Sequence, residues 1–262
     1  MTSEAGPSNR QVPPVVTIVM AVFNARLTLD QALAGIRSQK LDGIELVVVD
    51  GGSTDGTQEV LRQNLDVIDR YISERDTGIY NAWNKGLALA RGDWLAFVGA
   101  DDVYVAGALQ AYLDAASYSQ PGTELISSRV RYHPNFGKPF VIGRAWRWSE
   151  FQRHMTIAHV GALHRRKLYE RLGRYDERYK ICGDYELLLR ARDSLQTEFF
   201  PTVTIDMGGD GVSNNQLHRV YQETCRAKWE SGGRPRVSCE AERVWDHFRA
   251  KVKRALPRPG RR

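Results

Sequence analysis

The sequence predicts an α/β protein, with a mostly parallel sheet flanked by helices and a C-terminal amphipathic helical extension. Within the first 130 residues, apolar runs of strand length alternate with segments of helical periodicity, a pattern typical of strand–helix units around a parallel sheet. The apolar runs are rich in Val and Ile, as expected for strands that are buried on both faces. Beyond a Gly-Gly-Arg-Pro hinge at 232–235, apolar residues recur at helical spacing and predict the extension.

The elements of the first half follow one another in a regular order. Leu29, Leu33 and Ile36 repeat at helical spacing and predict the first helix. Predicted strands lie at 15–20, 44–50, 68–73 and 94–98, and predicted helices at 28–39, 57–64, 79–90 and 106–116. The second half is less periodic, with strands and loops predicted over 130–151, an extended segment over 157–164, and helices over 165–172, 184–192 and 215–230.

The composition is that of a globular protein with one large domain. Of the 262 residues, 42% are apolar and 26% are charged, so the chain is long enough to bury a substantial core. No apolar stretch approaches the ~18 residues of a membrane-crossing helix, and the polar N-terminus lacks the apolar core of a secretory signal, which predicts a cytoplasmic protein. The three cysteines lack metal-ligand spacing and predict neither a zinc module nor a disulfide scaffold.

The net charge of +6 is concentrated at one end of the chain. Residues 243–262 hold eight Lys or Arg against one Asp, a local net charge of +7, so the remainder is almost neutral. This is not the distributed basic face of a nucleic-acid-binding protein, and no nucleic-acid partner is expected. The segment also carries Trp245, Phe248, Val252 and Leu256, which leaves two interpretations: a solvated extension, or a peripheral contact with the anionic inner face of the cell membrane.

Four carboxylates follow the predicted strands. Asp50 ends the second strand, Asp76 follows the third, and Asp101 and Asp102 follow the fourth. Because ligands of open α/β sheets bind beyond the carboxyl ends of the strands, these side chains are expected to meet at one site. Their mutual repulsion requires a cation or hydrogen-bond donors, which indicates a metal or a hydroxyl-rich ligand.

Five motifs accompany these strand ends over residues 15–190. They are VTIVMAVFN at 16–24, VVDGGSTDGT at 48–57, ERDTGIYNAWNKG at 74–86, ARGDW at 90–94 leading to GADD at 99–102, and GDYE at 183–186. In this order and spacing they resemble the inverting glycosyltransferases of family 2, which have the GT-A (Rossmann-like) fold, and in particular bacterial enzymes that assemble cell-surface polysaccharides. The resemblance implies transfer of a sugar, with inversion, from a nucleoside-diphosphate sugar to a hydroxyl of a glycan or lipid-linked acceptor. By resemblance the donor is a UDP-sugar, with GDP and dTDP left open.

The resemblance also implies which residues bind the nucleotide. Asp50 matches the family's strand-end carboxylate that hydrogen-bonds the base, and Ala21 and Asn24 would line the same pocket. Asp76 and Asn84 match family elements beside the nucleotide.

A divalent cation, Mn²⁺ or Mg²⁺, is implied in the same way. Asp101 matches the last carboxylate of the family's Asp-X-Asp motif, which binds the metal between the two phosphates, and carboxylate oxygens suit these hard cations. Gly99 stands where the family has Asp or Asn, so Asp101 is expected to be the direct ligand and Asp102 its support. His159 matches a family histidine that is usually followed by Gln, here Val160, and could ligate the metal or donate to the diphosphate.

Asp184 matches the family's catalytic base, which accepts the proton of the acceptor hydroxyl. Structural alternatives stay open for several of these residues. Asp102 and Asp184 each precede or open a predicted helix and could be N-caps, and Asp50 could cap the turn that follows it. Trp146 and Trp148 could stack on a sugar ring, but aromatic pairs more often only pack.

Three other functions are alternatives to glycosyl transfer. A nucleotide-sugar pyrophosphorylase needs a Gly-rich phosphate loop with a basic residue after the first strand, where this chain has AVFN at 21–24. A dinucleotide oxidoreductase needs a Gly-X-Gly-X-X-Gly motif, which is missing. A non-catalytic nucleotide-sugar-binding or scaffold protein stays open because of Gly99.

The predicted organisation has three parts. A flexible N-terminus covers 1–14, and a GT-A domain covers 15–214, with a nucleotide-binding half at 15–130 and an acceptor half at 131–214. C-terminal helices and the basic tail cover 215–262.

Overall fold

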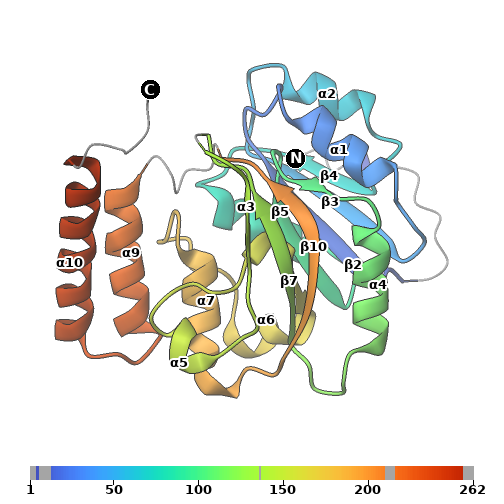
Figure 1. Cartoon of the computed structure of the whole chain (residues 1–262). Helices are drawn as coiled ribbons and strands as arrows, with labels where there is room; N and C mark the ends of the chain where they lie inside the picture. The colour runs from blue at the N-terminus through green and yellow to red at the C-terminus, as the bar shows by residue number, and fades with distance from the viewer. Residues whose placement is uncertain (1–3, 6–12, 136, 210–215, 256–262) are drawn as a thin grey trace.

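One mixed ten-stranded sheet forms the centre of the computed structural model, which describes residues 4–5, 13–135, 137–209 and 216–255 (Figure 1). The strand order is β1-β4-β3-β2-β5-β9-β7-β10-β6, with β8 paired to β7. The strands are β1 (Glu4–Ala5), β2 (Val16–Val22), β3 (Ile44–Asp50), β4 (Arg70–Ser73), β5 (Trp94–Gly99), β6 (Val103–Tyr104), β7 (Leu125–Tyr132), β8 (Phe140–Ile142), β9 (Ala162–Arg165) and β10 (Thr197–Met207).

The four strands β4, β3, β2 and β5 of the sheet are parallel, which confirms the predicted fold class. β2 pairs in parallel with β3 and β5, and β3 pairs in parallel with β4. All seven residues of β3 are buried, because helices cover both faces of a strand that is almost entirely apolar. The predicted strand at 44–50 matches β3 residue for residue. The carboxyl ends of β2, β3, β4 and β5 therefore lie along one edge.

The second half of the sheet is largely antiparallel and contains a strand that the sequence analysis did not predict. β9 lies antiparallel between β5 and β7, and β10 runs parallel to β7 and antiparallel to β6. No strand was predicted over the span of β10. Pro201 lies in the middle of β10, and the pairing register shifts between Phe199 and Val203, so the strand lacks an unbroken apolar pattern.

Helices cover both faces of the sheet. One layer contains α1 (Leu29–Arg37), α2 (Thr57–Gln63) and α4 (Ala108–Tyr118), and the other contains α3 (Ile79–Leu89), α6 (Arg166–Leu172), α7 (Gly183–Ala191) and α9 (Leu217–Glu230). Alternate residues of β2 face the two layers, with Ile18 and Met20 in the core of the first and Val19 in the core of the second. The short helix α5 (Trp148–Phe151) and two 3₁₀ turns, His159–Gly161 and Arg192–Ser194, complete this part.

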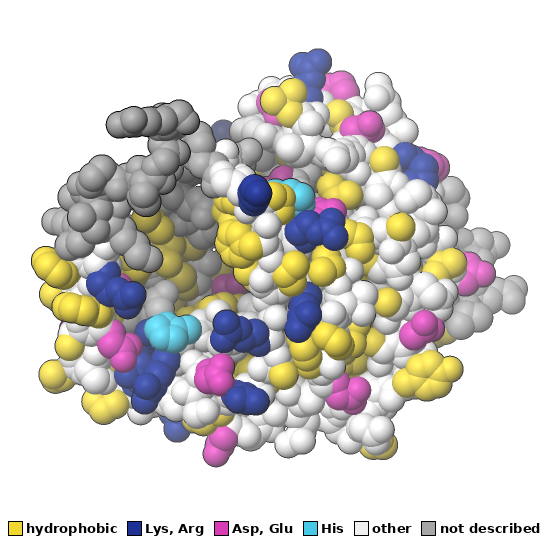
Figure 2. Space-filling view, viewed as in Figure 1, with side chains coloured by type: hydrophobic (Ala, Val, Ile, Leu, Met, Phe, Trp, Pro, Cys, Tyr) yellow, Lys and Arg dark blue, Asp and Glu magenta, His cyan; other side chains and the backbone are white. Residues whose placement is uncertain are grey.

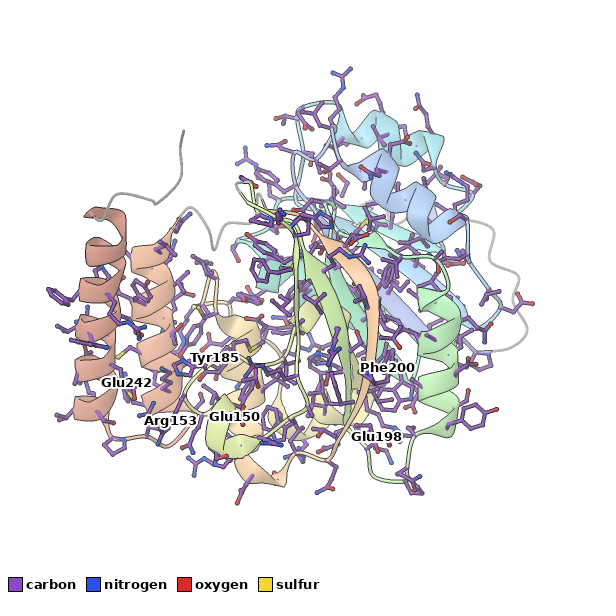
Figure 3. All side chains as sticks on the ribbon, viewed as in Figure 1. Glu150, Arg153, Tyr185, Glu198, Phe200 and Glu242 are labelled. Carbon is purple, nitrogen blue, oxygen red and sulfur yellow. The ribbon has the colours of Figure 1, made fainter. Side chains whose placement is uncertain are left out.

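The C-terminal helices form a pair beside the second layer (Figure 1). α9 packs against α7, and α10 (Arg236–Ala255) packs against α9. Glu242 of α10 lies between the two helices (Figure 3), where it accepts hydrogen bonds from Arg234 at 2.8 Å and Lys228 at 3.1 Å. These two cations lower the pKa of Glu242 to about 2. The predicted hinge is thus the turn between α9 and α10, in which Gly233 has φ +70°.

Two terminal predictions fall partly outside the described residues. Within the N-terminal segment, Glu4 and Ala5 pair with Tyr71 and Arg70 of β4, and the structure does not describe 1–3 or 6–12. The end of the basic tail, 256–262, and the 210–215 segment also lie outside the described residues. No helix in the described ranges is both long enough and apolar enough to span a membrane.

Candidate active site

Asp50 is buried at the end of β3 and joins three chain segments. Its carboxylate accepts hydrogen bonds from the hydroxyls of Ser53 at 2.5 Å and Ser73 at 2.6 Å. It also accepts the backbone N–H of Ser53 at 3.2 Å, so the turn-capping alternative has direct support. Asp50 therefore links the turn after β3 to β4 through its hydrogen bonds with Ser53 and Ser73. Its contact with a base stays a prediction.

Ala21, on β2, and Asn24, in the loop after β2, lie at the neighbouring strand end. Asn24 has a left-handed backbone with φ +47°. Its backbone N–H donates to Ser53 Oγ at 2.8 Å, and its side-chain oxygen accepts the N–H of Thr54 at 3.0 Å. Ala21 is half-buried opposite Gly99 on β5. The two residues therefore border the Asp50 turn, as the resemblance implies, and binding of a nucleotide by them stays a prediction.

Asp76 lies directly over the same turn. Its carboxylate contacts the backbone of Gly51 so closely that any β-carbon there would collide with it. Its Oδ1 accepts the N–H of Gly78 at 2.9 Å, just before α3 begins. The structure therefore brings Asp50 and Asp76 together, as their positions at adjacent strand ends predict.

Asn84 has a different environment from the one predicted. It is buried on α3, where its oxygen accepts the N–H of Tyr175 at 3.0 Å and its amide donates to the Tyr175 carbonyl at 2.9 Å and to Glu177 at 3.0 Å. Glu177 also accepts a hydrogen bond from Asn81 at 2.9 Å. Asn84 thus fastens α3 to the loop before α7. The structure adds no support for its direct contact with a nucleotide, which stays a prediction.

Asp101 lies between two glycines at the end of β5. A β-carbon at Gly99 would lie 2.8 Å from its Oδ1, and one at Gly208 would lie 2.8 Å from its Oδ2. Because neither glycine has a side chain, the half-buried Asp101 carboxylate fits between them. Gly99 therefore does more than omit a ligand, because it provides the space that Asp101 occupies.

Asp102 is buried behind Asp101 and faces the protein. Its Oδ2 accepts the N–H of Gly99 at 2.8 Å. Burial and the charge of Asp101 raise the pKa of Asp102 to about 7. The N-cap alternative for Asp102 is wrong, because α4 begins only at Ala108.

A divalent cation fits this pair of carboxylates. The half-buried Asp101 lies at a strand end with a second carboxylate behind it, and a cation there would offset the mutual repulsion that, in addition to burial, raises the pKa of Asp102. The described residues contain no cluster of three or more His, Cys, Asp or Glu that could enclose an ion. A cation held here would therefore take most of its ligands from phosphate oxygens and water.

His159 lies in an aromatic cluster under the site. Its ring centroid is 4.9 Å from that of Trp83 and 5.8 Å from that of Phe97, and its Nε2 is 3.1 Å from the Tyr175 hydroxyl. Its Nδ1 is buried and has no hydrogen-bond partner among the described residues. Burial lowers the pKa of His159, and the Asp184 carboxylate partly opposes this shift. These contacts are structural, so its metal or diphosphate role stays a prediction.

Asp184 is the second residue of α7 and faces α3. Tyr80 donates a hydrogen bond to its Oδ1 at 3.1 Å, and the N–H of Tyr185 donates to the same oxygen at 2.9 Å. The N-cap of α7 is Cys182, so the N-cap alternative for Asp184 is wrong. Burial, with the Asp184 charge, raises the pKa of Tyr80 well above its usual range, which keeps the phenol protonated as a donor.

Gly183 allows this contact between α3 and α7. A β-carbon on Gly183 would lie 2.8 Å from the ring of Tyr80. Tyr80 belongs to the same helix as Asn84, and that helix follows Asp76. The structure therefore connects Asp184, from the predicted acceptor half, to the 74–86 motif, which carries two of the predicted nucleotide residues.

A family comparison identifies the chain. Residues 17–173 match the family model "Glycosyl transferase family 2", which is more than half of the chain. The protein is a family 2 glycosyltransferase. Among curated proteins, the "PGL/p-HBAD biosynthesis glycosyltransferase" of Mycobacterium bovis strain BCG is 31% identical over 214 residues, covering 78% of this chain and 80% of that protein.

Solved structures show that this family 2 glycosyltransferase has a GT-A fold. S. aureus TarS residues 1–349 in complex with UDP-GlcNAc superposes with a TM-score of 0.65 at 14% identity, covering 89% of this chain and 72% of that one. Glucosyl-3-phosphoglycerate synthase from Mycobacterium tuberculosis, in a complex that contains Mn²⁺ and UDP, gives a TM-score of 0.56 at 16% identity, covering 85% and 81%.

Sequence reasoning missed several residues that contact the candidate site residues. Tyr80 lies inside the motif at 74–86, but its contact with Asp184 depends on the fold and cannot be read from the sequence. Glu177 and Gly208 lie outside the motifs, and no sequence signal distinguished them from ordinary loop residues.

Proposed function

We propose that this enzyme transfers a sugar from a UDP-sugar to a hydroxyl of a glycan or lipid-linked acceptor, with inversion, in bacterial polysaccharide or glycolipid synthesis. The observation that carries the proposal is the hydrogen bond between Tyr80 and Asp184. It joins the proposed base to the 74–86 motif, whose Asp76 and Asn84 are predicted nucleotide residues. The UDP and UDP-GlcNAc complexes of TarS support UDP as the nucleotide. The M. bovis relative, named for PGL/p-HBAD biosynthesis, supports a glycolipid or glycan acceptor.

The carboxylate of Asp184 is arranged for general-base work. Both of its hydrogen bonds go to Oδ1, so within the described ranges Oδ2 has no partner and is the oxygen that can accept a proton. In the proposed reaction Oδ2 takes the proton of the acceptor hydroxyl as that oxygen attacks the anomeric carbon opposite the diphosphate, which inverts its configuration. Tyr80 fixes the orientation of the carboxylate during this step.

Asp101 would hold Mn²⁺ or Mg²⁺ beside the diphosphate, with Asp102 as its support from behind, and the cation would supply Lewis-acid stabilisation of the leaving group. The Mn²⁺ complexes of glucosyl-3-phosphoglycerate synthase and of a mannosyltransferase from Pyrobaculum calidifontis support a divalent ion. Ala21, Asn24, Asp50 and Asp76 would form the nucleotide pocket between the ends of β2 and β4.

A panel of nucleotides tests the donor. UDP, GDP and dTDP are compared by thermal shift with and without Mn²⁺, and the corresponding nucleotide sugars are assayed for transfer or hydrolysis. UDP with Mn²⁺ is expected to give the largest increase in melting temperature, together with metal-dependent turnover of a UDP-sugar. A larger increase with GDP or dTDP contradicts the UDP assignment. Binding without turnover under all metals and acceptors favours a non-catalytic scaffold.

We also propose that the outer face of α10 rests on an anionic membrane. Val237, Val244, Trp245 and Phe248 recur at helical spacing on this face and are 83%, 60%, 57% and 57% exposed. The rings of Trp245 and Phe248 stack at 5.9 Å, and Figure 2 shows hydrophobic side chains along the edge of the molecule that α10 forms. The net charge of +7 over 243–262 complements anionic headgroups, and exposed aromatics next to basic residues suit the interface.

Replacing both aromatics, in Trp245→Ser with Phe248→Ser, is expected to weaken binding to phosphatidylcholine vesicles containing phosphatidylglycerol by at least about tenfold, because two large apolar side chains no longer insert. Binding is measured by co-sedimentation. Tyr118→Ser is the matched control, since Tyr118 is 82% exposed on α4. Equal binding of the double variant and the wild type, or equal binding of the wild type to vesicles without phosphatidylglycerol, contradicts the proposal.

A further inference from the structure

The loop that leads into the Asp184 helix is held by one carboxylate from the C-terminal helix pair. Glu223 of α9 accepts the backbone N–H groups of Lys180 at 3.0 Å, Ile181 at 2.8 Å and Cys182 at 3.0 Å. The side chain of Arg219 donates to the same carboxylate at 3.1 Å. Three consecutive N–H groups thus converge on a side chain that is only 6% exposed.

Burial of the Glu223 carboxylate costs hydration free energy, so its position depends on the hydrogen-bond donors around it. A buried carboxylate needs several donors to offset its lost hydration, and the three N–H groups with Arg219 supply them. The N–H groups of 180–182 precede the first helical turn of α7, and the acceptor that the described residues give them is Glu223. Hydrogen bonds to a charged acceptor are the stronger kind, so the contact fixes the loop more firmly than a neutral acceptor could.

The same loop determines where Tyr80 and Asp184 meet. The Tyr80 hydroxyl lies 2.7 Å from the carbonyl oxygen of Ile181 and 3.1 Å from Asp184 Oδ1, so both acceptors share one donor. Ile181 is also the residue whose N–H makes the shortest contact with Glu223. Movement of the loop would therefore change the position of the Tyr80 hydroxyl and, through it, the orientation of Asp184.

We propose that Glu223 is a positioning residue for the catalytic base. It touches no reacting group. It holds 180–182 in the conformation that places Asp184 against Tyr80. The inference rests on the proposed role of Asp184, and it gives the C-terminal helices a function in catalysis in addition to any contact with a membrane.

Other contacts keep α9 in place without Glu223. Ser231 donates to Glu186 of α7 at 2.6 Å, and Tyr179 donates to Glu230 at 3.2 Å. The guanidinium of Arg226 lies 3.8 Å from the centroid of the Tyr179 ring. Removal of the Glu223 carboxylate is therefore expected to release the loop while α9 stays docked.

The test compares Glu223→Ala with Glu223→Gln, with Glu240→Gln as the matched control, because Glu240 is a partly exposed carboxylate of the same helix pair that pairs with Arg243 on α10. Glu223→Ala is expected to lower kcat at least about tenfold while donor KM and UDP affinity change less than about twofold, since misplacing a catalytic group by about 1 Å can cost far more than that. Glu223→Gln is expected to lose less kcat than Glu223→Ala, because its amide oxygen can still accept from the three N–H groups, although without the charge of the carboxylate. An unchanged kcat in Glu223→Ala, or a parallel loss of UDP binding, overturns the inference.

A double variant separates this inference from the proposed function. If Glu223 acts through Asp184, adding Glu223→Ala to Asp184→Asn is expected to cause less than a twofold further loss of the residual kcat. A further tenfold loss overturns the positioning role. If Asp184→Asn alone leaves turnover unchanged, the assignment of the base is wrong. If Asp184→Asn lowers kcat as expected and Glu223→Ala leaves kcat unchanged, only the positioning role is wrong.

Discussion

Asp184→Asn is expected to lower kcat for sugar transfer by about 10²- to 10⁴-fold, the range that general-base catalysis contributes. The amide keeps the size of the side chain and the oxygen that accepts from Tyr80 and Tyr185, so α7 and its contact with α3 should persist. What is lost is the second oxygen, Oδ2, as a proton acceptor. Donor KM and UDP affinity are expected to stay within about twofold of wild type, because the nucleotide residues lie on other elements.

Initial rates at saturating donor measure the effect on kcat, and calorimetric titration with UDP measures binding. Asp193→Asn is the control, because Asp193 is an exposed Asp just beyond the same helix. A kcat of Asp184→Asn within threefold of the control would falsify the assignment of the base. Loss of UDP binding in Asp184→Asn would show instead that the residue supports the nucleotide pocket.

Asp101→Ala is expected to remove the metal-dependent part of UDP binding. In the wild type, Mn²⁺ should add to the thermal stabilisation by UDP, and in the variant that increment should vanish. The affinity for UDP with Mn²⁺ is expected to fall at least about tenfold, which corresponds to ~1.4 kcal/mol. Without metal, the variant should bind UDP at least as well as the wild type, since a negative charge near the diphosphate has been removed.

Thermal shift and calorimetric titration with and without Mn²⁺ measure both quantities. Asp114→Asn is the matched control, because Asp114 is exposed on α4, where it accepts a hydrogen bond from Gln110 of the same helix. If UDP with Mn²⁺ stabilises Asp101→Ala and the wild type equally, Asp101 is not the metal ligand. In that case the two glycines that flank it serve another purpose.

The sequence predicted the first half of the fold well because its strands are uniformly apolar. β3 matches its predicted range residue for residue, and α3 ends within one residue of its prediction. β10 escaped prediction because Pro201 breaks its pattern, and its partners β7 and β6 are distant in the chain. Pairings of that kind depend on tertiary context rather than on local propensity.

The candidate site was predictable in its strand-end carboxylates and not in its supporting contacts. Asp50 and Asp76 meet because parallel strands end at one edge, which is a rule of topology. The contact of Tyr80 with Asp184 and the contact of Glu223 with 180–182 join segments about 100 and 40 residues apart. No periodicity or motif spacing encodes such distances. The N-cap alternatives for Asp102 and Asp184 were wrong because helix boundaries are the least predictable feature of a sequence.

The contact between Glu223 and the 180–182 loop also has a consequence for folding during synthesis. A nascent chain leaves the ribosome N-terminus first, and segments fold as their partners emerge. The first hundred residues contain β2, β3, β4 and β5, which pair with one another. Cys182, in contrast, donates to Glu223, which is synthesised 41 residues later. The strand ends that carry Asp50 and Asp101 can therefore assemble while the 180–182 loop still lacks its acceptor. Under the proposed function, the growing chain forms most of the proposed donor site before the proposed base is held in position.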